Sequence, residues 1–206
     1  MSDLQASNAA GQRGPADHNI RDQIIEAADE HFSHYGYGKT TVADLAKAIG
    51  FSKAYIYKFF DSKQAIGEAI CERCLGSIVA SVEEAVAEGK TATDKLRRLI
   101  KTISALSCEL FFNDRKLYDI AAFSCAEGWP SSEAYVARVG AMLAEILQEG
   151  RASGEFERKT PIDETVRAIV LVFQPFMNPL MLQHNLDAVP EGANEVTNLV
   201  LRSLAP

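Results

Sequence analysis

The sequence predicts an all-α protein. Apolar residues recur at spacings of three and four positions throughout the 206-residue chain, as expected of helices that each bury one face. Alternating β-branched runs bounded by turns, which would indicate strands, are absent from the sequence. Short stretches containing Gly, Pro, Asn or Asp separate the helical segments. We therefore expect an N-terminal three-helix domain of the helix-turn-helix type, joined to a larger helical domain.

Residues 1–17 form the first predicted segment. They are mostly small and polar and include Gly and Pro, so they cannot bury enough apolar surface to offset the cost of ordering. They also lack the apolar stretch of an export signal. We expect a disordered tail over residues 1–17, followed by domains over residues 18–64 and 65–206. The longest apolar run, residues 168–173, is far shorter than the roughly 20 residues that span a bilayer, which predicts a cytoplasmic protein with no membrane partner.

The first helix of the N-terminal domain has apolar residues on one face and charged residues on the other. The apolar face is predicted to consist of Ile20, Ile24, Ala28, Phe32 and Tyr35. Gly36 follows directly, and glycine is typical of the position that ends a helix.

The second and third helices are short and close together in the sequence. Thr41 and Asp44 have the spacing of a capping box at the start of the second helix, which Gly50 ends. Ser52 is predicted to cap the third helix, with Ile56 on its inner side. A fourth helix is expected from residue 63 to about residue 88.

The letters GYGKTT at residues 36–41 look like the end of a nucleotide-binding loop. That loop requires a glycine five positions before Gly38 and a buried strand ahead of it. The sequence has Ser33 at that position and an amphipathic helix before it. The pattern therefore argues against an NTPase. No nucleophile–base–acid set or metal cluster points to another class of enzyme, and no cofactor is expected.

Two short helices joined by residues 50–52 instead have the arrangement of a helix-turn-helix, whose second helix enters the major groove of DNA. A plain three-helix bundle would explain the apolar spacing equally well. It would not explain the outer face of the third helix, where Tyr55 and Tyr57 stand beside Lys53 and Lys58. Exposed aromatic groups are costly in water unless they meet a partner. DNA offers phosphates to the lysines and base edges to the tyrosines.

The distribution of charge agrees with one local contact to a polyanion. The chain has a net charge of −7, yet residues 36–63 contain five lysines and only two acidic residues. A small basic island on an acidic protein indicates a localised nucleic-acid contact rather than a general one.

The segment from residue 21 to residue 66 resembles the DNA-binding domain of the TetR/AcrR family of bacterial transcriptional regulators. The resemblance rests on I-x-x-A-A at 24–28, F-x-x-x-G-Y at 32–37, T-T-V-x-D-L-A at 40–46, I-G-F-S-K at 49–53, I-Y-x-F-F at 56–60 and S-K at 62–63. It implies a repressor that binds double-stranded DNA at a near-palindromic operator as a homodimer and is released by a small, largely apolar effector. The alternative is a DNA-binding member of this family that has no small-molecule inducer.

The resemblance also assigns DNA contacts to matching positions. They are Thr41, Ser52, Lys53, Ala54, Tyr55, Tyr57, Lys58, Phe59 and Lys63. Lys63 would neutralise a phosphate at the positive end of the fourth helix. The family often has glycine in place of Ala54 and histidine in place of Phe59, so base preference does not carry over and Phe59 could lie in the core instead.

The rest of the chain is expected to form the ligand-binding and dimerisation domain. Its helices are predicted near residues 93–112, 114–127, 131–153, 162–184 and 192–204. Pro175 and Pro179 should kink or interrupt the fourth of these. The last two helices offer apolar faces, either for a dimer interface or for burial within one subunit. These faces contain Ile169, Val172, Phe173, Phe176, Val196, Leu199, Val200 and Leu204.

A ligand pocket in this domain would combine apolar walls with a few polar groups. The candidate residues are Phe111, Tyr118, Phe123, Trp129, Tyr135, Met142, Phe173, Gln174, Met177 and His184. Each of them could equally be an ordinary core residue. Gln174 is the most informative candidate, because a neutral polar group among apolar neighbours can orient a ligand by hydrogen bonds.

Cys71 and Cys74 are spaced so that both thiols lie on one face of the fourth helix. Three interpretations are open: packing as small buried residues, thiol sensing, and metal binding. A zinc or copper site would need further ligands, and the sequence offers no paired His/Cys cluster nearby. We therefore predict no metal site.

Overall fold

The computed structural model describes residues 15–206, and all of the regular structure within them is helical, which confirms the predicted fold class. The elements are α1 (Pro15–Tyr35), α2 (Val42–Ile49), α3 (Lys53–Ile56), α4 (Lys63–Ala87), α5 (Ala92–Asn113), α6 (Arg115–Ala126), α7 (Pro130–Ser153), α8 (Ile162–Val172), α9 (Gln174–Met177), α10 (Pro179–Leu182), the 3₁₀ turn η1 (Leu186–Ala188) and α11 (Glu191–Ser203). Helix α1 begins three residues before the predicted boundary at residue 18. Proline is well suited to a first helical position, where no N–H partner is needed. Residues 1–14 of the predicted tail lie outside the described residues.

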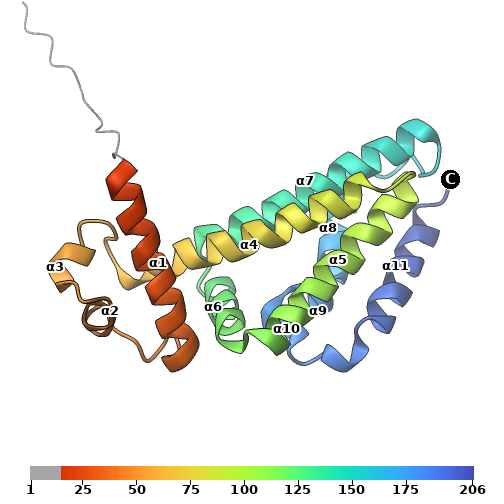
Figure 1. The fold of residues 1–206 in the computed structure, drawn as a ribbon. Coiled ribbons are helices and arrows are strands. Elements are labelled where there is room, and N and C mark those ends of the chain that lie inside the picture. The colour runs from red at the N-terminus through yellow and green to blue at the C-terminus, as the bar shows by residue number, and fades with distance from the viewer. Residues whose placement is uncertain (1–14) are drawn as a thin grey trace, which may run out of the picture.

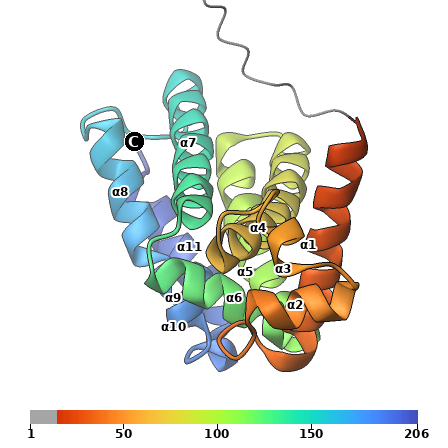
Figure 2. The same cartoon turned by 90° about the vertical axis from the view of Figure 1, so that its left-hand side faces the viewer.

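Helices α1, α2 and α3 gather at one end of the molecule around the start of α4 (Figures 1 and 2). Helix α2 begins at the predicted capping box: Thr41 Oγ1 accepts from the Asp44 N–H, and Asp44 Oδ2 accepts from the Thr41 N–H. Gly50 ends α2 in the left-handed conformation with φ of 78°. Local signals in the sequence therefore determine these two boundaries.

Tyr35 does not belong to the buried face of α1, contrary to expectation. Its side chain is 63% exposed, whereas Phe32 is fully buried. The chain reverses at Gly36, whose φ of 83° favours glycine, and Tyr37 then folds back so that its ring lies edge-on to Phe32 at 5.2 Å. Tyr37 therefore occupies the buried position that the helical period assigned to Tyr35.

Helix α4 connects the two ends of the molecule and belongs to both apolar cores (Figure 1). Ile66 and Ile70, near its start, pack in the N-terminal core, and Val82, near its end, packs in the C-terminal core. The N-terminal core also includes Ile120 and Trp129, which come from beyond the predicted boundary at residue 64. The two cores therefore divide farther along α4 than the predicted boundary at residue 64.

The C-terminal core lies between α4, α5, α7, α8 and α11 (Figures 1 and 2). The segment predicted as one kinked helix over residues 162–184 is interrupted twice, just before Pro175 and just before Pro179. Asn178 caps the third piece, since its Oδ1 accepts from the Leu180 N–H at 2.9 Å. The predicted interruption is thus confirmed, and it produces the short helices α9 and α10.

Most of the apolar face predicted for the last two helices points into the subunit. Ile169, Phe173, Phe176, Val200 and Leu204 are all buried in the C-terminal core. Of that predicted face, Val172 and Leu199 are exposed and Val196 is partly buried. Most of this apolar stripe therefore packs inside the subunit and is not available for contact with a second subunit. Over residues 15–206, no helix combines the length and hydropathy that a transmembrane segment requires.

Candidate DNA-binding surface and ligand cavity

Helix α3 presents a set of exposed side chains over a buried anchor. Ser52 caps the helix, because its Oγ accepts from the Tyr55 N–H at 3.1 Å. Ile56 is fully buried and fixes the inner side. The exposed residues on this short element are Ser52, Lys53, Ala54, Tyr57 and Lys58. Because the helix has only four residues, its orientation depends on the cap and the anchor.

Aromatic packing supports the exposed face of α3. The ring of Tyr55 lies edge-on between Phe51, at 5.1 Å, and Phe59, at 5.4 Å. Both Tyr55 and Phe59 are half-buried, and Phe59 packs against the N-terminal core. The alternative in which Phe59 belongs to the core thus holds in part. The Lys58 ammonium lies 5.5 Å from the Tyr55 ring centre, a distance at which a cation and a ring attract each other.

Thr41 is exposed, but its hydroxyl has partners within the protein. Thr41 Oγ1 lies 2.7 Å from Asp44 Oδ2, to which it donates, and it also accepts from the Asp44 N–H. The hydrogen bond from the Thr41 side chain is the largest cause that lowers the pKa of the Asp44 carboxyl. A phosphate contact at Thr41 would therefore form beside an ionised carboxylate, and this contact stays a prediction.

The Lys63 side chain is not free in solvent, because it contacts Tyr37. Its ammonium donates to the Tyr37 carbonyl at 3.0 Å and lies 4.2 Å from the centre of the Tyr37 ring. Burial lowers the pKa of Lys63. A lysine has three N–H donors, so two remain for a phosphate in addition to the Tyr37 contact.

Phe123 and Trp129, predicted as pocket residues, lie instead in a joint between the two ends of the molecule. We call this set the aromatic joint: Tyr37, Phe123 and Trp129, packed on Gly67. The Tyr37 ring centre is 5.2 Å from that of Phe123 and 5.4 Å from that of Trp129. A Cβ placed on Gly67 would lie 2.9 Å from both Tyr37 and Trp129. The joint is therefore packed without spare room.

A cavity of about 80 Å³ lies deeper in the C-terminal part of the molecule. Its walls come from α4, α5, α6, α7, α8, α9 and α10. The lining residues are Leu75, Ile78, Ser107, Leu110, Tyr118, Ala121, Cys125, Ser132, Tyr135, Val136, Val139, Val170, Gln174, Met177, Asn178 and Pro179. None of these sixteen, all within the described part of the chain, carries a charged side chain. Tyr118, Tyr135, Gln174 and Met177 were among the residues predicted for a pocket.

The other predicted pocket residues lie elsewhere. Phe111 packs edge-on against Tyr118 at 4.9 Å, behind the wall rather than in it. Met142 and Phe173 are buried in the C-terminal core, and His184 is exposed beyond α10. These residues therefore do not line this cavity, because apolar character alone does not distinguish a cavity wall from solid core.

Several polar groups of the cavity wall are already paired with each other. Gln174 Nε2 donates to the Val170 carbonyl at 3.2 Å, and Asn178 Nδ2 donates to Gln174 Oε1 at 2.9 Å. The Tyr118 hydroxyl donates to the Pro179 carbonyl at 2.7 Å. Gln174 therefore orients Asn178 in this state. Asn178 was missed, although an asparagine directly before a proline is a recognisable turn and cap signal.

The cysteines show no arrangement suited to redox or metal chemistry over residues 15–206. Burial raises the pKa of the Cys71 thiol to about 12 and that of Cys74 to about 11. Thiols with raised pKa values are poor nucleophiles at neutral pH. All four cysteines are free thiols, and the described residues contain no cluster of three or more His, Cys, Asp or Glu that could hold a metal ion. These observations favour the interpretation of Cys71 and Cys74 as packing residues.

Two family models match the chain, one in its N-terminal part and one in its C-terminal part. Residues 24–70 match the family described as "Bacterial regulatory proteins, tetR family", and residues 92–196 match "Tetracyclin repressor-like, C-terminal domain". The "HTH-type transcriptional activator FasR" of Mycolicibacterium smegmatis is 33% identical over 98 residues, 48% of this chain and 43% of that protein. The "Fatty acid metabolism regulator protein" of Bacillus subtilis is 33% identical over 78 residues, 38% of this chain and 40% of that protein. The chain therefore spans less than half the length of these curated relatives.

Solved structures share the fold over nearly the whole chain. A TetR family transcriptional regulator, PfmR, from Thermus thermophilus is 27% identical with a TM-score of 0.57, covering 89% of this chain and 99% of that one. The transcriptional regulator FadR from Bacillus subtilis, in complex with stearoyl-CoA, is 24% identical with a TM-score of 0.57, covering 89% and 98%. The arrangement of a small N-terminal helix group on a larger helical domain is thus common to these proteins.

Proposed function

Because the chain belongs to the tetR family of bacterial regulatory proteins, we propose that it is a DNA-binding transcriptional repressor that a small, largely apolar effector releases from its operator. The observation that carries this proposal is the exposed face of α3. Lys53, Tyr57 and Lys58 stand out over the buried Ile56, in a basic island of an otherwise acidic chain. Such a face supplies charge to phosphates and hydroxyls to base edges. The DNA partner implies a cytoplasmic location.

The proposed DNA-bound form is a homodimer. A single α3 reads only a few base pairs, and two copies about one helical turn of DNA apart would read the two halves of a near-palindrome. Leu171 and Val172 on α8 and Leu199 on α11 remain exposed after the subunit has folded. These three side chains support a partner contact made by α8 and α11, in place of the larger apolar face that the subunit buries itself.

The proposed release follows from where the cavity lies on α4. Leu75 and Ile78 of α4 form part of the cavity wall, and Lys63 at the start of the same helix holds Tyr37. The free space of about 80 Å³ is below the 300–1,000 Å³ typical of ligand sites, so an effector must be slender or must push the wall outward. An effector that binds the shifted state more tightly by about 1.4 kcal/mol lowers DNA affinity tenfold.

The relatives support an acyl compound as the effector. One relative is a fatty acid metabolism regulator by name, and one solved structure with the same fold holds stearoyl-CoA. The sixteen residues around the cavity are mainly apolar and none is charged, which suits a hydrocarbon chain. The small volume of the cavity also favours a second candidate function, a DNA-binding regulator that has no inducer.

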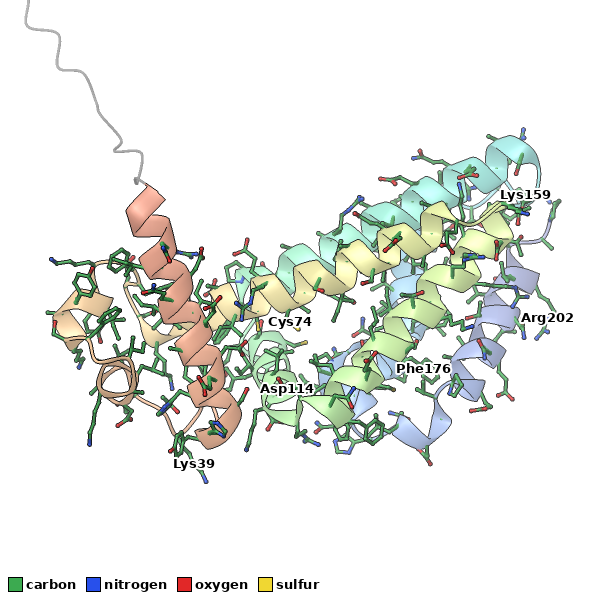
Figure 3. All side chains as sticks on the ribbon, in the orientation of Figure 1. Lys39, Cys74, Asp114, Lys159, Phe176 and Arg202 are labelled. Carbon is green, nitrogen blue, oxygen red and sulfur yellow. The ribbon has the colours of Figure 1, made fainter. Side chains whose placement is uncertain are left out.

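The DNA face is tested by selecting operator fragments from genomic DNA and measuring affinity by gel shift. Replacing Lys53 and Lys58 together with alanine should weaken operator binding at least about 100-fold, because two phosphate contacts and their counterion release are lost. The slope of affinity against salt concentration should also fall. The matched control is Lys159→Ala. Lys159 lies at the opposite end of the molecule from Lys39 and from helices α1–α3 (Figure 3).

Operator affinity that stays unchanged in the double variant would contradict the proposed DNA face. The direction of regulation needs a separate measurement, because one relative is an activator by name. Transcription from the selected operator should fall when the protein is added. An increase would replace the proposed repressor with an activator and would leave the DNA face in place.

A further inference from the structure

The cavity contains four hydroxyl groups, and they differ in whether the protein already satisfies them. The Tyr118 hydroxyl donates to the Pro179 carbonyl at 2.7 Å, and the Ser132 hydroxyl donates to the Trp129 carbonyl at 2.9 Å. The Ser107 hydroxyl makes no hydrogen bond within the described residues, but it lies within α5, where a serine can donate to a carbonyl one turn back, as Ser104 does to Ile100 at 2.8 Å. These three hydroxyls have, or can reach, a partner in the backbone.

The Tyr135 hydroxyl also makes no hydrogen bond within the described part of the chain, unlike those of Tyr118 and Ser132, and unlike Ser107 it cannot turn back to its own helix. The side chain is long enough to carry the hydroxyl away from the α7 backbone, and it lines both the cavity and a groove between α4 and α7. Burial raises the pKa of this hydroxyl strongly, so Tyr135 stays neutral and keeps its proton at physiological pH. Tyr135 is half-buried, and its oxygen is not among the fully buried atoms that lack a partner in the described part of the chain. The hydroxyl is therefore a free donor that a ligand in the cavity can use.

The surroundings of Tyr135 restrict which acceptor can bind. The cavity wall is apolar apart from neutral hydroxyl, thiol and amide groups. A carboxylate placed there would lose its hydration without gaining a cation, and an unpaired buried charge costs far more than a neutral group. The groove that shares Tyr135 is lined by Glu68, Glu72 and Arg138. The Arg138 guanidinium is already paired with Glu83 and Glu145, so the two carboxylates of the groove would repel an anion approaching from that side. A neutral carbonyl oxygen fits these conditions and a carboxylate does not.

We propose that the cavity takes an uncharged carbonyl compound, an acyl ester or thioester rather than the free acid, and that the Tyr135 hydroxyl donates a hydrogen bond to its carbonyl oxygen. This inference rests on the proposed function for the existence of an effector, and it specifies the chemical end group that the effector presents. In an acyl conjugate with a charged head, the hydrocarbon and the carbonyl enter the cavity and the head stays outside.

The test compares three probes of similar length in isothermal titration calorimetry at pH 7, using the full chain without DNA. The probes are methyl octanoate, which has a neutral carbonyl, octanoate, which is charged, and nonane, which has no acceptor. Methyl octanoate should bind at least about tenfold more tightly than octanoate, because the carboxylate remains unpaired. Octanoate that binds as tightly as the ester would overturn the proposal, and so would the absence of binding by all three probes.

The role of Tyr135 is tested with Tyr135→Phe, which removes only the hydroxyl. The affinity for methyl octanoate should fall about three- to tenfold, as expected for one lost hydrogen bond, whereas the affinity for nonane should change by less than about twofold. Tyr118→Phe is the matched control, since the Tyr118 hydroxyl is already used by Pro179. In that variant the ratio of ester to nonane affinity should stay as in the unmodified protein. An equal loss for both probes in Tyr135→Phe would overturn the role of the hydroxyl.

The two proposals fail in different measurements. Ester binding without release from the operator in a gel shift would count against the proposed effector control, while the end-group selectivity would stand. Release of the operator by octanoate but not by methyl octanoate would support effector control and overturn the neutral end group.

Discussion

The aromatic joint and the cavity are both built on α4, and they differ in how much space they leave. At the joint, Gly67 has no room even for a methyl group between Tyr37 and Trp129. At the cavity, Leu75 lines about 80 Å³ of free space. The two positions are eight residues apart, roughly 12 Å along the helix. The free space gives a ligand its starting point on α4, and the tight contacts of the joint pass a shift of α4 on to α1–α3.

Adding a methyl group at the aromatic joint should have the largest effect on stability. Gly67→Ala should lower the free energy of unfolding by about 1–3 kcal/mol, because the new Cβ would displace two buried rings. It should also weaken operator binding, since Tyr37 holds Lys63 and packs on Phe32. Urea denaturation and a gel shift measure the two effects.

Gly76→Ala is the control on the same helix. A Cβ on Gly76 meets no atom within 4 Å in the described part of the chain, so alanine there should stabilise the protein by about 0.5–1 kcal/mol through helix propensity alone. If both variants changed stability equally, the joint would not be tightly packed.

Filling the cavity should have a smaller effect on stability and a larger one on ligand response. Ala121→Leu adds three carbons toward the free space lined by Ala121, and we expect the free energy of unfolding to change by less than about 1.5 kcal/mol. Binding of methyl octanoate should be lost, while operator binding stays intact. Ala126→Leu, at an exposed position of the same helix, serves as the control for calorimetry and should leave ligand binding unchanged. Ligand binding that survives Ala121→Leu would place the site elsewhere.

The sequence predicted those parts of the molecule that depend on nearby residues. The caps at Thr41 and Ser52 and the break before Pro179 depend on residues within a few positions of each other, and all three are where we expected them. The helix order and the exposed face of α3 follow from the same local signals.

The failures involve residues that meet across elements. Trp129 was assigned to a pocket because a large aromatic group suits one, but it packs on Tyr37, a residue far away in the sequence. Tyr35 was assigned to the core because the helical period placed it there, and the turn at Gly36 gave that place to Tyr37. A helical stripe shows that a residue can be buried but not which partner buries it.

The smallest expected effect concerns a polar seam where α1, α4 and α6 meet. Asp29 of α1 pairs with Arg73 of α4 at 2.7 Å and lines the same groove as Asp114, at the start of α6 (Figure 3 labels Asp114). Burial is the largest cause that raises the pKa of Asp29, the nearby charge of Asp114 adds to it, and Arg73 opposes it. One carboxylate oxygen of Asp29 is buried with no partner within residues 15–206.

A carboxyl whose pKa is raised by folding contributes stability that is present below its unfolded pKa, near 3.8, and is lost as the pH rises through the folded value. Asp29→Asn removes this titration while keeping an oxygen for Arg73. The variant should therefore match the unmodified protein near pH 3.5 and become slightly more stable above the raised pKa, by less than about 1 kcal/mol because the side chain is partly exposed to solvent. Thermal unfolding measured from about pH 3.5 to pH 7 checks this. If the variant instead became less stable than the unmodified protein as the pH rose, folding would favour the ionised form of Asp29, and the Asp29–Arg73 ion pair would stabilise the contact between α1 and α4.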